Sequence, residues 1–315
     1  MYESLLQLDP IRINFSQSGT HVLNIILAFV MFGVALGIRP GQFKNVVTAP
    51  KPFIVGLVSQ IIALPSMTFL LVLALSNYIT PSVAMGMILV AACPGGNISN
   101  FMTHFSKGNT ELAVTLTASS TIFSVVVTPF NFAFWGGLYV NFISRRAGEM
   151  LQPLEIDMYQ MFQTVFIILG IPLVLGILFA RYFPKATEKL KKPIQIVSIL
   201  FFIALVVIAF SNNFELFVKY ILYIFFIVLV HNALALGSGY GLASAFKLSN
   251  ENRRTLTIET GIQNSGLGLV LLFNPKIFPE HLAIGGMLFI TAWWGIWHII
   301  SGLSISAYWS RKPVN

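Results

Sequence analysis

Long apolar stretches, nine in all, alternate along this chain with short polar segments. Each holds about 20 residues or more, enough for an α-helix to cross a hydrocarbon layer about 30 Å thick. They run roughly over residues 21–38, 52–75, 82–105, 109–137, 158–181, 193–211, 217–246, 254–273 and 283–309. With 56% hydrophobic and 10% charged residues, a single water-soluble globule could not bury this surface. The sequence therefore predicts an all-α polytopic membrane protein with nine transmembrane helices.

The loops between the stretches are short, so residues 1–315 are predicted to form one membrane-embedded unit. The first 20 residues lack the pattern of a cleaved signal peptide and are expected to be a mature N-terminus. Alternate loops hold 14 lysines and arginines on one side and 5 on the other, and such residues favour the cytoplasmic side. This predicts the cell's inner (plasma) membrane, with the N-terminus outside and the C-terminus in the cytoplasm. The same topology explains the net charge of +8, so no nucleic-acid partner is expected.

Helix-breaking polar segments interrupt two of the stretches. The third contains Cys93 to Asn100 (CPGGNISN), and the eighth contains Glu259 to Gly266 (ETGIQNSG). Proline removes a backbone donor and glycine weakens a helix, while unsatisfied backbone groups in hydrocarbon cost several kcal/mol each. Paired breaks in two halves of a chain indicate the binding site of a transporter. The alternative is a pair of packing kinks filled by neighbouring Ser and Thr.

Among the eleven acidic residues, Glu259 alone lies well inside a predicted span and beside a break. A charge at the centre of a membrane helix costs at least about 2.5–3.5 kcal/mol, and no basic residue lies deep in a span to pair with it. A bound cation or a proton must therefore neutralise it. The nearby Asn, Gln, Ser and Thr oxygens suit a hard cation, and no Cys and His cluster for zinc or iron is present. Since one carboxylate balances one positive charge, Na⁺ is the expected ligand.

Other polar residues allow a purely structural interpretation. Gln60 and Thr117 could serve only as hydrogen bonders between helices, and His298 could be a satisfied structural histidine. His104 and His231 are placed near span ends and receive no role. Because no nucleophile–base–acid set, Walker loop or dinucleotide fingerprint occurs, an enzyme is not predicted. A membrane-embedded enzyme or a receptor is the non-transport alternative.

Taken together, the motifs resemble the bile acid:sodium symporter family, in particular its bacterial members. They are Ala92–Gly96 with Ser99 and Asn100, Thr257–Glu259 with Gln263–Gly266, and Trp297-His298 with Ser301-Gly302, in matching order over about 290 residues. The resemblance implies an inverted repeat with a panel domain and a core domain, whose two broken helices cross. Some relatives have ten spans, of which the first is expected to be missing. The panel would be about 21–38 and 158–211, and the core about 52–137 and 217–309.

Site residues follow from the same resemblance. A first sodium site would use Ser99, Asn100, Thr117 and Glu259. A second would use the Gln60 and Gln263 side chains, Glu259 again, and backbone carbonyls near Thr260 and Ile262. Ala113 stands where relatives often have serine, one turn before Thr117, which leaves one or two sodium ions open. The substrate would contact Asn97 first, with Asn264 and His298 as second contacts.

These observations predict sodium-coupled symport of an organic anion, a bile acid or a smaller carboxylate, by alternating access. The lipid bilayer is the expected surrounding, and no obligate protein partner is evident. A proton-coupled carrier that uses the same Glu259 is one alternative. An arsenite-type efflux carrier of related fold, with Cys93 as a thiolate ligand, is another.

Overall fold

A computed structural model of the chain describes residues 1–11, 25, 28–38, 40–43, 50–147, 158–211, 214–279 and 282–314. Within these ranges the regular structure is helical, apart from one bridge between two extended residues. In chain order the elements are α1 (Tyr2–Leu6), η1 (Pro40–Phe43), α4 (Pro50–Val58), η2 (Ser59–Ala63), α5 (Leu64–Ala74), α6 (Pro81–Ala92), α7 (Ile98–Phe105), α8 (Thr110–Ala147), α9 (Met158–Val165), η3 (Phe166–Gly170), α10 (Ile171–Tyr182), α11 (Pro184–Ser211), α12 (Phe214–Ala245), α13 (Asn250–Gly261), α14 (Ser265–Leu272) and α15 (Gly285–Ser310). Residues 28–35 are also helical.

Four of the described helices are long and apolar enough to cross a membrane: Pro50–Ala74, Thr110–Arg145, Val218–Ala245 and Gly285–Ser310. Two shorter apolar helices are Pro81–Ala92 and Ile171–Tyr182. Each of the nine predicted stretches contains helical residues, the first of them at 25 and 28–35 within the described part. The all-helical membrane class is thus confirmed in outline, whereas the number of nine spans stays a prediction.

The second stretch forms one rod from α4, η2 and α5, in which η2 is a single π-helical turn. Pro65 follows this turn and has no N–H, so the carbonyl of Ile61 loses its helical donor. The amide of Asn131 on α8 replaces it, with Nδ2 donating to the Ile61 oxygen at 2.8 Å. Turns of this kind often occur at functional sites, and here η2 buries the side chains of Ser59 and Gln60.

Both predicted helix breaks are present, and both are shorter than the polar segments that indicated them. The first lies between α6 and α7, so Ser99 and Asn100 fall in the first turn of α7. The second lies between α13 and α14, so Glu259 falls in the last turn of α13. Ser99, Asn100 and Glu259 are therefore held on helix ends, whereas Gln263 lies in the extended chain of the second break.

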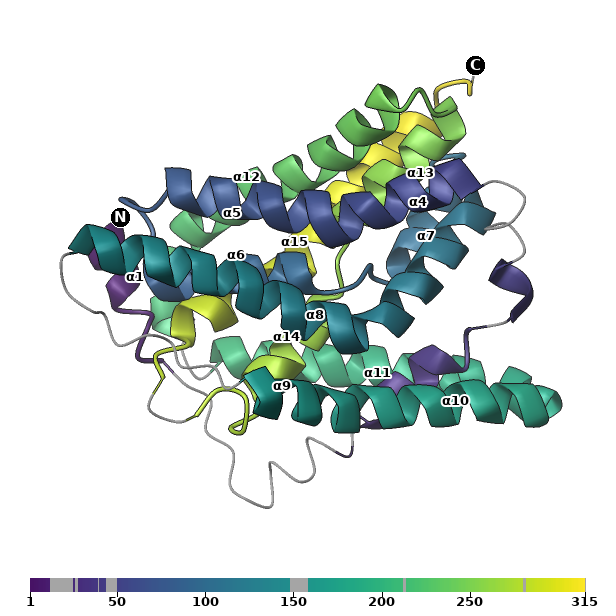
Figure 1. The fold of residues 1–315 in the computed structure, drawn as a ribbon, viewed down its shortest axis with the longest axis horizontal. Coiled ribbons are helices and arrows are strands. Elements are labelled where there is room, and N and C mark those ends of the chain that lie inside the picture. The colour runs from purple at the N-terminus through teal and green to yellow at the C-terminus, as the bar shows by residue number, and fades with distance from the viewer. Residues whose placement is uncertain are drawn as a thin grey trace.

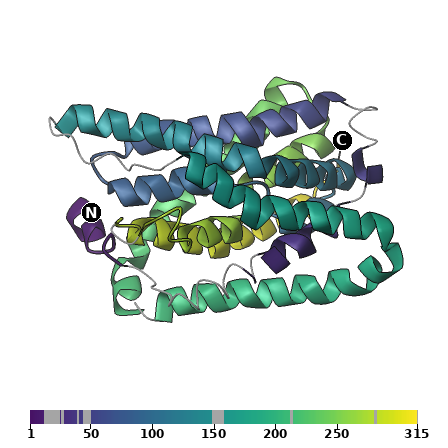
Figure 2. The same cartoon turned by 60° about the horizontal axis from the view of Figure 1, so that its bottom comes forward.

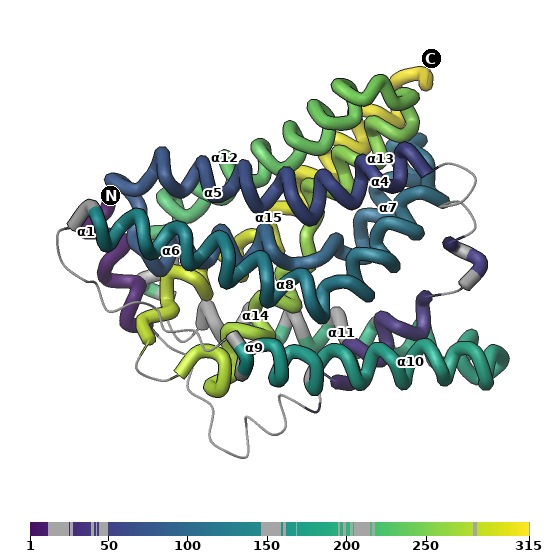
Figure 3. Tube along the Cα trace, viewed as in Figure 1, coloured from purple at the N-terminus to yellow at the C-terminus, as the bar shows by residue number. Residues whose placement is uncertain are grey.

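The two extended segments pair with each other where they meet (Figures 1 and 3). Gly95 and Gln263 form an antiparallel bridge. On either side of it, the Gly96 amide donates to the Ile262 carbonyl and the Asn264 amide donates to the Pro94 carbonyl, both at 2.8 Å. Part of the backbone freed by the breaks is thus satisfied by the opposite break, as hydrocarbon surroundings demand.

The fourth stretch continues further than predicted. Its helix, α8, runs to Ala147 and not to about residue 137. Residues 138–147 contain no proline or glycine to end the helix. The end of an apolar run is therefore a poor guide to the end of this helix.

Residues 28–38 pack with α10 and α11 along one edge of the molecule, where α10 and α11 form a hairpin (Figures 1 and 2). The rings of Phe32 and Phe179 are 5.6 Å apart. A Cβ on Gly176 would lie 2.5 Å from that of Ala35, so glycine permits this close approach. The group lies within the predicted panel, 21–38 and 158–211, and the division into panel and core stays a prediction.

The first residues of the chain pack against the start of α6, the helix that precedes the first break, and against the start of α15. Leu5 and Leu8 are fully buried, and the backbone oxygen of Asp9 accepts from the Gly285 amide at 3.0 Å. The Asp9 carboxylate also accepts from the Thr80 hydroxyl at 3.0 Å. Burial raises the pKa of the Asp9 carboxyl to about 6, although the Thr80, Ser82 and Gly286 hydrogen bonds oppose this shift.

Candidate sodium and anion site

Four helix ends meet at the crossing: α6 and α13 end there, and α7 and α14 begin there (Figures 1 and 3). The last carbonyls of a helix lack helical donors and carry partial negative charge, while the first amides carry partial positive charge. Ends of the first kind favour cations and ends of the second kind favour anions. One small region of the fold thus offers both kinds of site.

The carboxylate of Glu259 lies at the centre of this region and is fully buried. The Ser99 hydroxyl on α7 donates to its Oε1. Its Oε2 accepts from the Thr117 hydroxyl on α8 at 2.9 Å and from Gln60 Nε2 at 3.4 Å. In the described chain these side-chain partners are all neutral, so the buried acid is hydrogen-bonded without a basic partner.

Side-chain amides from η2, α12 and the second break bind the carbonyls at the end of α13. Gln60 Nε2 donates to the Glu259 oxygen at 3.1 Å, and Gln263 Nε2 donates to the Thr260 oxygen at 2.8 Å. Asn232 Nδ2, from α12, donates to the Gly261 oxygen at 2.8 Å. These bonds satisfy carbonyls that the helix itself cannot satisfy, and they hold the three amide groups in place.

The oxygens of these three amides differ in what they bind. Gln60 Oε1 and Gln263 Oε1 are buried without a hydrogen-bond partner. Asn232 Oδ1 instead accepts from the Ser301 hydroxyl on α15 at 2.5 Å. Since an unpartnered buried acceptor costs about 1–3 kcal/mol, the two glutamine oxygens fit a cation ligand, whereas Asn232 fits a structural role. Oxygen donors of this kind suit a hard cation such as Na⁺.

The structure brings together all four residues of the predicted first sodium set. Beyond the bonds to Glu259, the Ser99 and Thr117 hydroxyls are 3.4 Å apart, and Thr117 donates to Asn100 Oδ1 at 3.4 Å. Ala113 lies one turn earlier on α8 and is fully buried. The second predicted set also meets here through the amide contacts to Glu259 and Thr260, while its Ile262 carbonyl already accepts from Gly96. The assignment of these sets to sodium stays a prediction.

The three residues predicted to contact substrate lie around the crossing in different settings. Asn97 is exposed at the start of α7, and its side chain caps no helix amide. Asn264 is half-buried and uses Oδ1 to accept from the Leu267 amide at 3.1 Å, so it caps α14.

His298 faces the second break from α15. A Cβ on Gly295 would be 2.9 Å from Ser265 Oγ, and one on Gly302 would be 2.7 Å from Ile262. Residues 295, 298 and 302 share one face of a helix, so this face passes along the second break. His298 is buried, and its Nδ1 has no partner.

Two neighbours of the site were not predicted. Ser59 Oγ lies 2.7 Å from Thr260 Oγ1, and Asn232 holds the end of α13. The placement of His231 near a span end was wrong, because it lies in the middle of α12, fully buried, with Nε2 2.8 Å from the Thr68 hydroxyl. The signal was available, since His231 and Asn232 form an adjacent polar pair inside an apolar run.

The apolar helices define an integral membrane protein, and a buried carboxylate among neutral donors is a feature of membrane carriers. A model of the sodium bile acid symporter family matches residues 24–220. The chain is 30% identical over 290 residues to an uncharacterized sodium-dependent transporter of Bacillus subtilis, covering 92% of this chain and 83% of that protein. The chain belongs to the sodium bile acid symporter family, a family of sodium-coupled transporters and not of enzymes.

Two further relatives are longer than this chain. A probable sodium/metabolite cotransporter of rice, Oryza sativa subsp. japonica, described as chloroplastic, is 27% identical over 284 residues, which are 87% of this chain and 64% of that protein. Human sodium/bile acid cotransporter 4 is 27% identical over 273 residues, or 85% of this chain and 59% of that protein. The chain thus spans less than two thirds of either protein, and the substrates given in their names differ.

Proposed function

We propose that the protein is a secondary active transporter that couples inward movement of sodium to uptake of an organic anion, either a bile acid or a smaller carboxylate. The observation that carries this proposal is the buried Glu259 carboxylate, which is surrounded by neutral donors and by two unpartnered amide oxygens. A charge in this setting requires a cation or a proton. Membership of a sodium-coupled family favours the cation.

In this mechanism sodium binds Glu259 with Ser99, Asn100 and Thr117. The number of ions, one or two, stays open; a second ion would use the Gln60 and Gln263 side chains, Glu259 again, and the carbonyls near Thr260 and Ile262. Sodium neutralises the carboxylate and replaces hydrogen bonds that otherwise tie the amides to α13. The anion binds beside the crossing, at the starts of α7 and α14, where Asn97, Asn264 and His298 are available. The positive ends of both short helices favour a carboxylate there.

Coupling follows from binding both charges at one crossing. Linkage requires sodium to raise the affinity for the anion by the same factor as the anion raises the affinity for sodium. With the N-terminus outside and the C-terminus in the cytoplasm, each net positive charge moved inward gains about 2.3 kcal/mol per 100 mV. The core, 52–137 and 217–309, then moves against the panel, 21–38 and 158–211. The grouping of α10 and α11 with residues 28–38 supports this division.

Uptake into vesicles tests the proposal. Purified protein in liposomes should accumulate an unmodified bile acid or a short carboxylate when sodium is imposed outside, and should not do so with potassium. A parallel experiment applies a pH gradient without sodium to test proton coupling. Uptake driven by the pH gradient alone would favour the proton-coupled carrier. The variant Cys93→Ala should retain uptake. If it loses all function, the arsenite-type carrier is favoured, and a protein that binds anions without accumulating them would be a receptor.

A further inference from the structure

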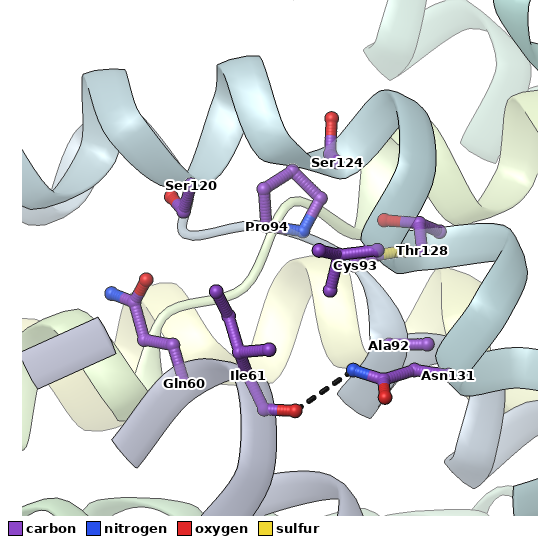
Figure 4. Close-up of a pocket in the computed structure, with 10 residues that line it drawn as sticks. Gln60, Ile61, Ala92, Cys93, Pro94, Ser120, Ser124, Thr128 and Asn131 are labelled. Carbon is purple, nitrogen blue, oxygen red and sulfur yellow. Dashed lines mark hydrogen bonds between the residues drawn. The ribbon is translucent and has the colours of Figure 1, made fainter. Parts of the chain in front are cut away.

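A small cavity beside the crossing is a space for water and not for a ligand. It lies between η2, the end of α6 and one face of α8 (Figure 4), with room for about one water molecule. On its wall, Asn131 Nδ2 donates to the Ile61 carbonyl at 2.8 Å. The features that point to a further ligand lie on the surface of the helices instead.

The turn between α10 and α11 carries a large part of the charge of this protein. Residues 181–192 contain five basic residues and one acidic residue, a net charge of +4 out of +8 for the whole chain. In Figures 1 and 2 the turn lies at the right-hand end of the molecule, the end toward which the C-terminus also lies. The predicted topology places this end in the cytoplasm, where the membrane surface is negatively charged.

The turn is short and is held by its own backbone. Because α10 ends at Tyr182 and α11 begins at Pro184, Phe183 alone connects them. The Phe183 amide donates to the Phe179 carbonyl at 2.8 Å. The amide and the hydroxyl of Thr187 donate to the Phe183 carbonyl at 2.9 and 3.0 Å. The basic side chains are therefore presented by two helix ends in a defined arrangement.

One face of α11 carries three lysines and then becomes apolar. Lys185, Lys189 and Lys192 are exposed and recur at helical spacing. Ile196 and Leu200 continue the same face along the helix, and they are 49% and 59% exposed. These five residues are called the lysine face below. A band of positive charge thus lies directly next to an exposed apolar band on one helix.

The residues around the lysine face leave its charge in place. Glu188 lies beside it, so three positive charges stand against one negative charge. Lys191 is half-buried, and its Nζ would lie 3.7 Å from a Cβ on Gly37, just after helical residues 28–35. At the end of α10, Arg181 is exposed and Tyr182 is 69% exposed. Exposed aromatic and basic residues together are typical of the membrane–water interface.

Two arginines near the same end of the molecule bind within the protein. Arg254 is buried, and its Nη1 donates to the carbonyls of Ser106 and Trp309 at 2.8 and 3.2 Å. Arg253 Nε donates to the Leu248 carbonyl at 2.8 Å. The lysines of the lysine face point outward instead, so they can bind a ligand that lies outside the chain.

We propose that the lysine face binds an anionic phospholipid, with the phosphate headgroup at Lys185, Lys189 and Lys192. An acyl chain of the same lipid lies along Ile196 and Leu200. Clusters of basic residues next to a membrane helix attract anionic headgroups, and the apolar continuation of the face suits an acyl chain. A soluble phosphate has no part that would occupy this apolar band. The surface lies within the predicted panel, and its binding of lipid is independent of which substrate is transported.

Photolabelling locates the lipid. The purified protein in neutral detergent receives a trace of phosphatidylglycerol that carries a photoreactive acyl chain, and after irradiation the labelled peptides are identified by mass spectrometry. We expect label on α11, and we expect unlabelled phosphatidylglycerol to displace it at a concentration about tenfold or more below that of phosphatidylcholine, which has no net charge.

Two matched triple variants test the lysines. The test variant replaces the three lysines of the lysine face with glutamine: Lys185→Gln, Lys189→Gln and Lys192→Gln. The control replaces three other exposed lysines that are predicted to lie on the same side of the membrane: Lys51→Gln, Lys107→Gln and Lys247→Gln. Both variants lose three positive charges, so a difference between them reports position and not net charge. We expect the test variant to lose the preference for phosphatidylglycerol and the control to keep it within about twofold.

Several results would overturn the proposal. They are absence of label from α11, equal displacement by the two lipids, and equal losses in the test and control variants. Displacement by inorganic phosphate as effective as that by phosphatidylglycerol would show a site for free phosphate instead. If the test variant does not fold, Lys189→Gln is compared with Lys189→Arg, and only the arginine variant should keep the preference. Because no step of this experiment measures transport, its failure is distinct from failure of the proposed function.

Discussion

The two helix breaks pair with each other, yet their amino-acid compositions differ. The first, between α6 and α7, is formed by Pro94, Gly95 and Gly96 and follows a helix whose last eleven residues are buried, nearly all of them apolar. The second, between α13 and α14, follows a polar helix that carries Glu259 and is held by side-chain amides. The first break provides room and backbone, and the second provides charge. The space and the charge of a single site thus come from two segments that are more than 150 residues apart in the sequence.

The division has a physical reason. A carboxylate in hydrocarbon needs neutral hydrogen-bond donors from several directions. Because Gly95 has no side chain, such donors can approach the carboxylate closely. A Cβ on Gly95 would lie 3.2 Å from Gln60 Nε2 and 3.4 Å from Glu259 Oε2. The charge of the second break is therefore accommodated by the small residues of the first.

Removal of the charge should have the largest effect. In Glu259→Gln we expect a folded protein that sodium no longer stabilises, because the amide offers no charge to neutralise. For the unmodified protein, sodium at about 100 times its dissociation constant should add roughly 2.7 kcal/mol. Thermal unfolding in detergent, with sodium or potassium, measures the difference. Glu251→Gln is the control, since Glu251 is exposed on the same helix; sodium stabilisation that persists in Glu259→Gln contradicts the site.

Loss of an amide at the second break should have the next largest effect. Asn232→Ala leaves the Gly261 carbonyl without its partner and leaves the Ser301 hydroxyl with the His298 carbonyl of its own helix. We expect it to lower the free energy of unfolding by about 1–3 kcal/mol. Ser301→Ala should cost less, because Asn232 keeps its bond to Gly261. Chemical unfolding compares both with Ser304→Ala, whose exposed hydroxyl bonds only the Ile300 carbonyl of its own helix. A cost for Asn232→Ala no greater than for Ser304→Ala would show that α13 does not need this amide.

Adding a methyl group at Gly95 tests whether the first break provides the space that the Glu259 carboxylate needs. Gly95→Ala places a Cβ against the Gln60 amide and the Glu259 carboxylate, so we expect sodium affinity to fall by about threefold to tenfold, or roughly 1 kcal/mol, with unfolding in potassium little changed. Gly137→Ala is the matched control, because its Cβ would have no atom within 4 Å. Calorimetric titration with sodium separates the two. An unaltered affinity in Gly95→Ala would mean that the break does not serve the charge.

The features that could be predicted from the sequence alone also differ between the two breaks. A helix break is predicted directly by the residue types of Pro94, Gly95 and Gly96. Glu259 is predicted as a site residue because a single acidic residue in an apolar run is costly to bury. Both are properties of a few neighbouring residues. Gln60, Thr117 and Gln263 are ordinary polar residues, and only resemblance to a family gave them roles.

The partners of the α13 carbonyls required the folded structure. Gln60 contacts the Glu259 backbone across 199 residues and Asn232 contacts Gly261 across 29, so no spacing rule connects them. The lengths of the breaks were overestimated for a related reason, because helix ends depend on which carbonyls find outside donors. The pairing of the two breaks supplies donors for the carbonyls of Pro94 and Ile262, so the extended chain is confined to a few residues between the helices.

The smallest expected effect concerns a ligand that this chain lacks. Ala113 is buried one turn before Thr117, and a methyl group cannot bind a cation. In Ala113→Ser an added hydroxyl should strengthen sodium binding by about twofold to fivefold, less than a full hydrogen bond to a charge because the new group must also lose water. Calorimetry of Ala113→Ser, with Ala118→Ser as a buried control on the same helix, measures it. Unaltered or weaker binding would show that the Glu259 centre is already complete with the donors that α7, α8 and η2 provide.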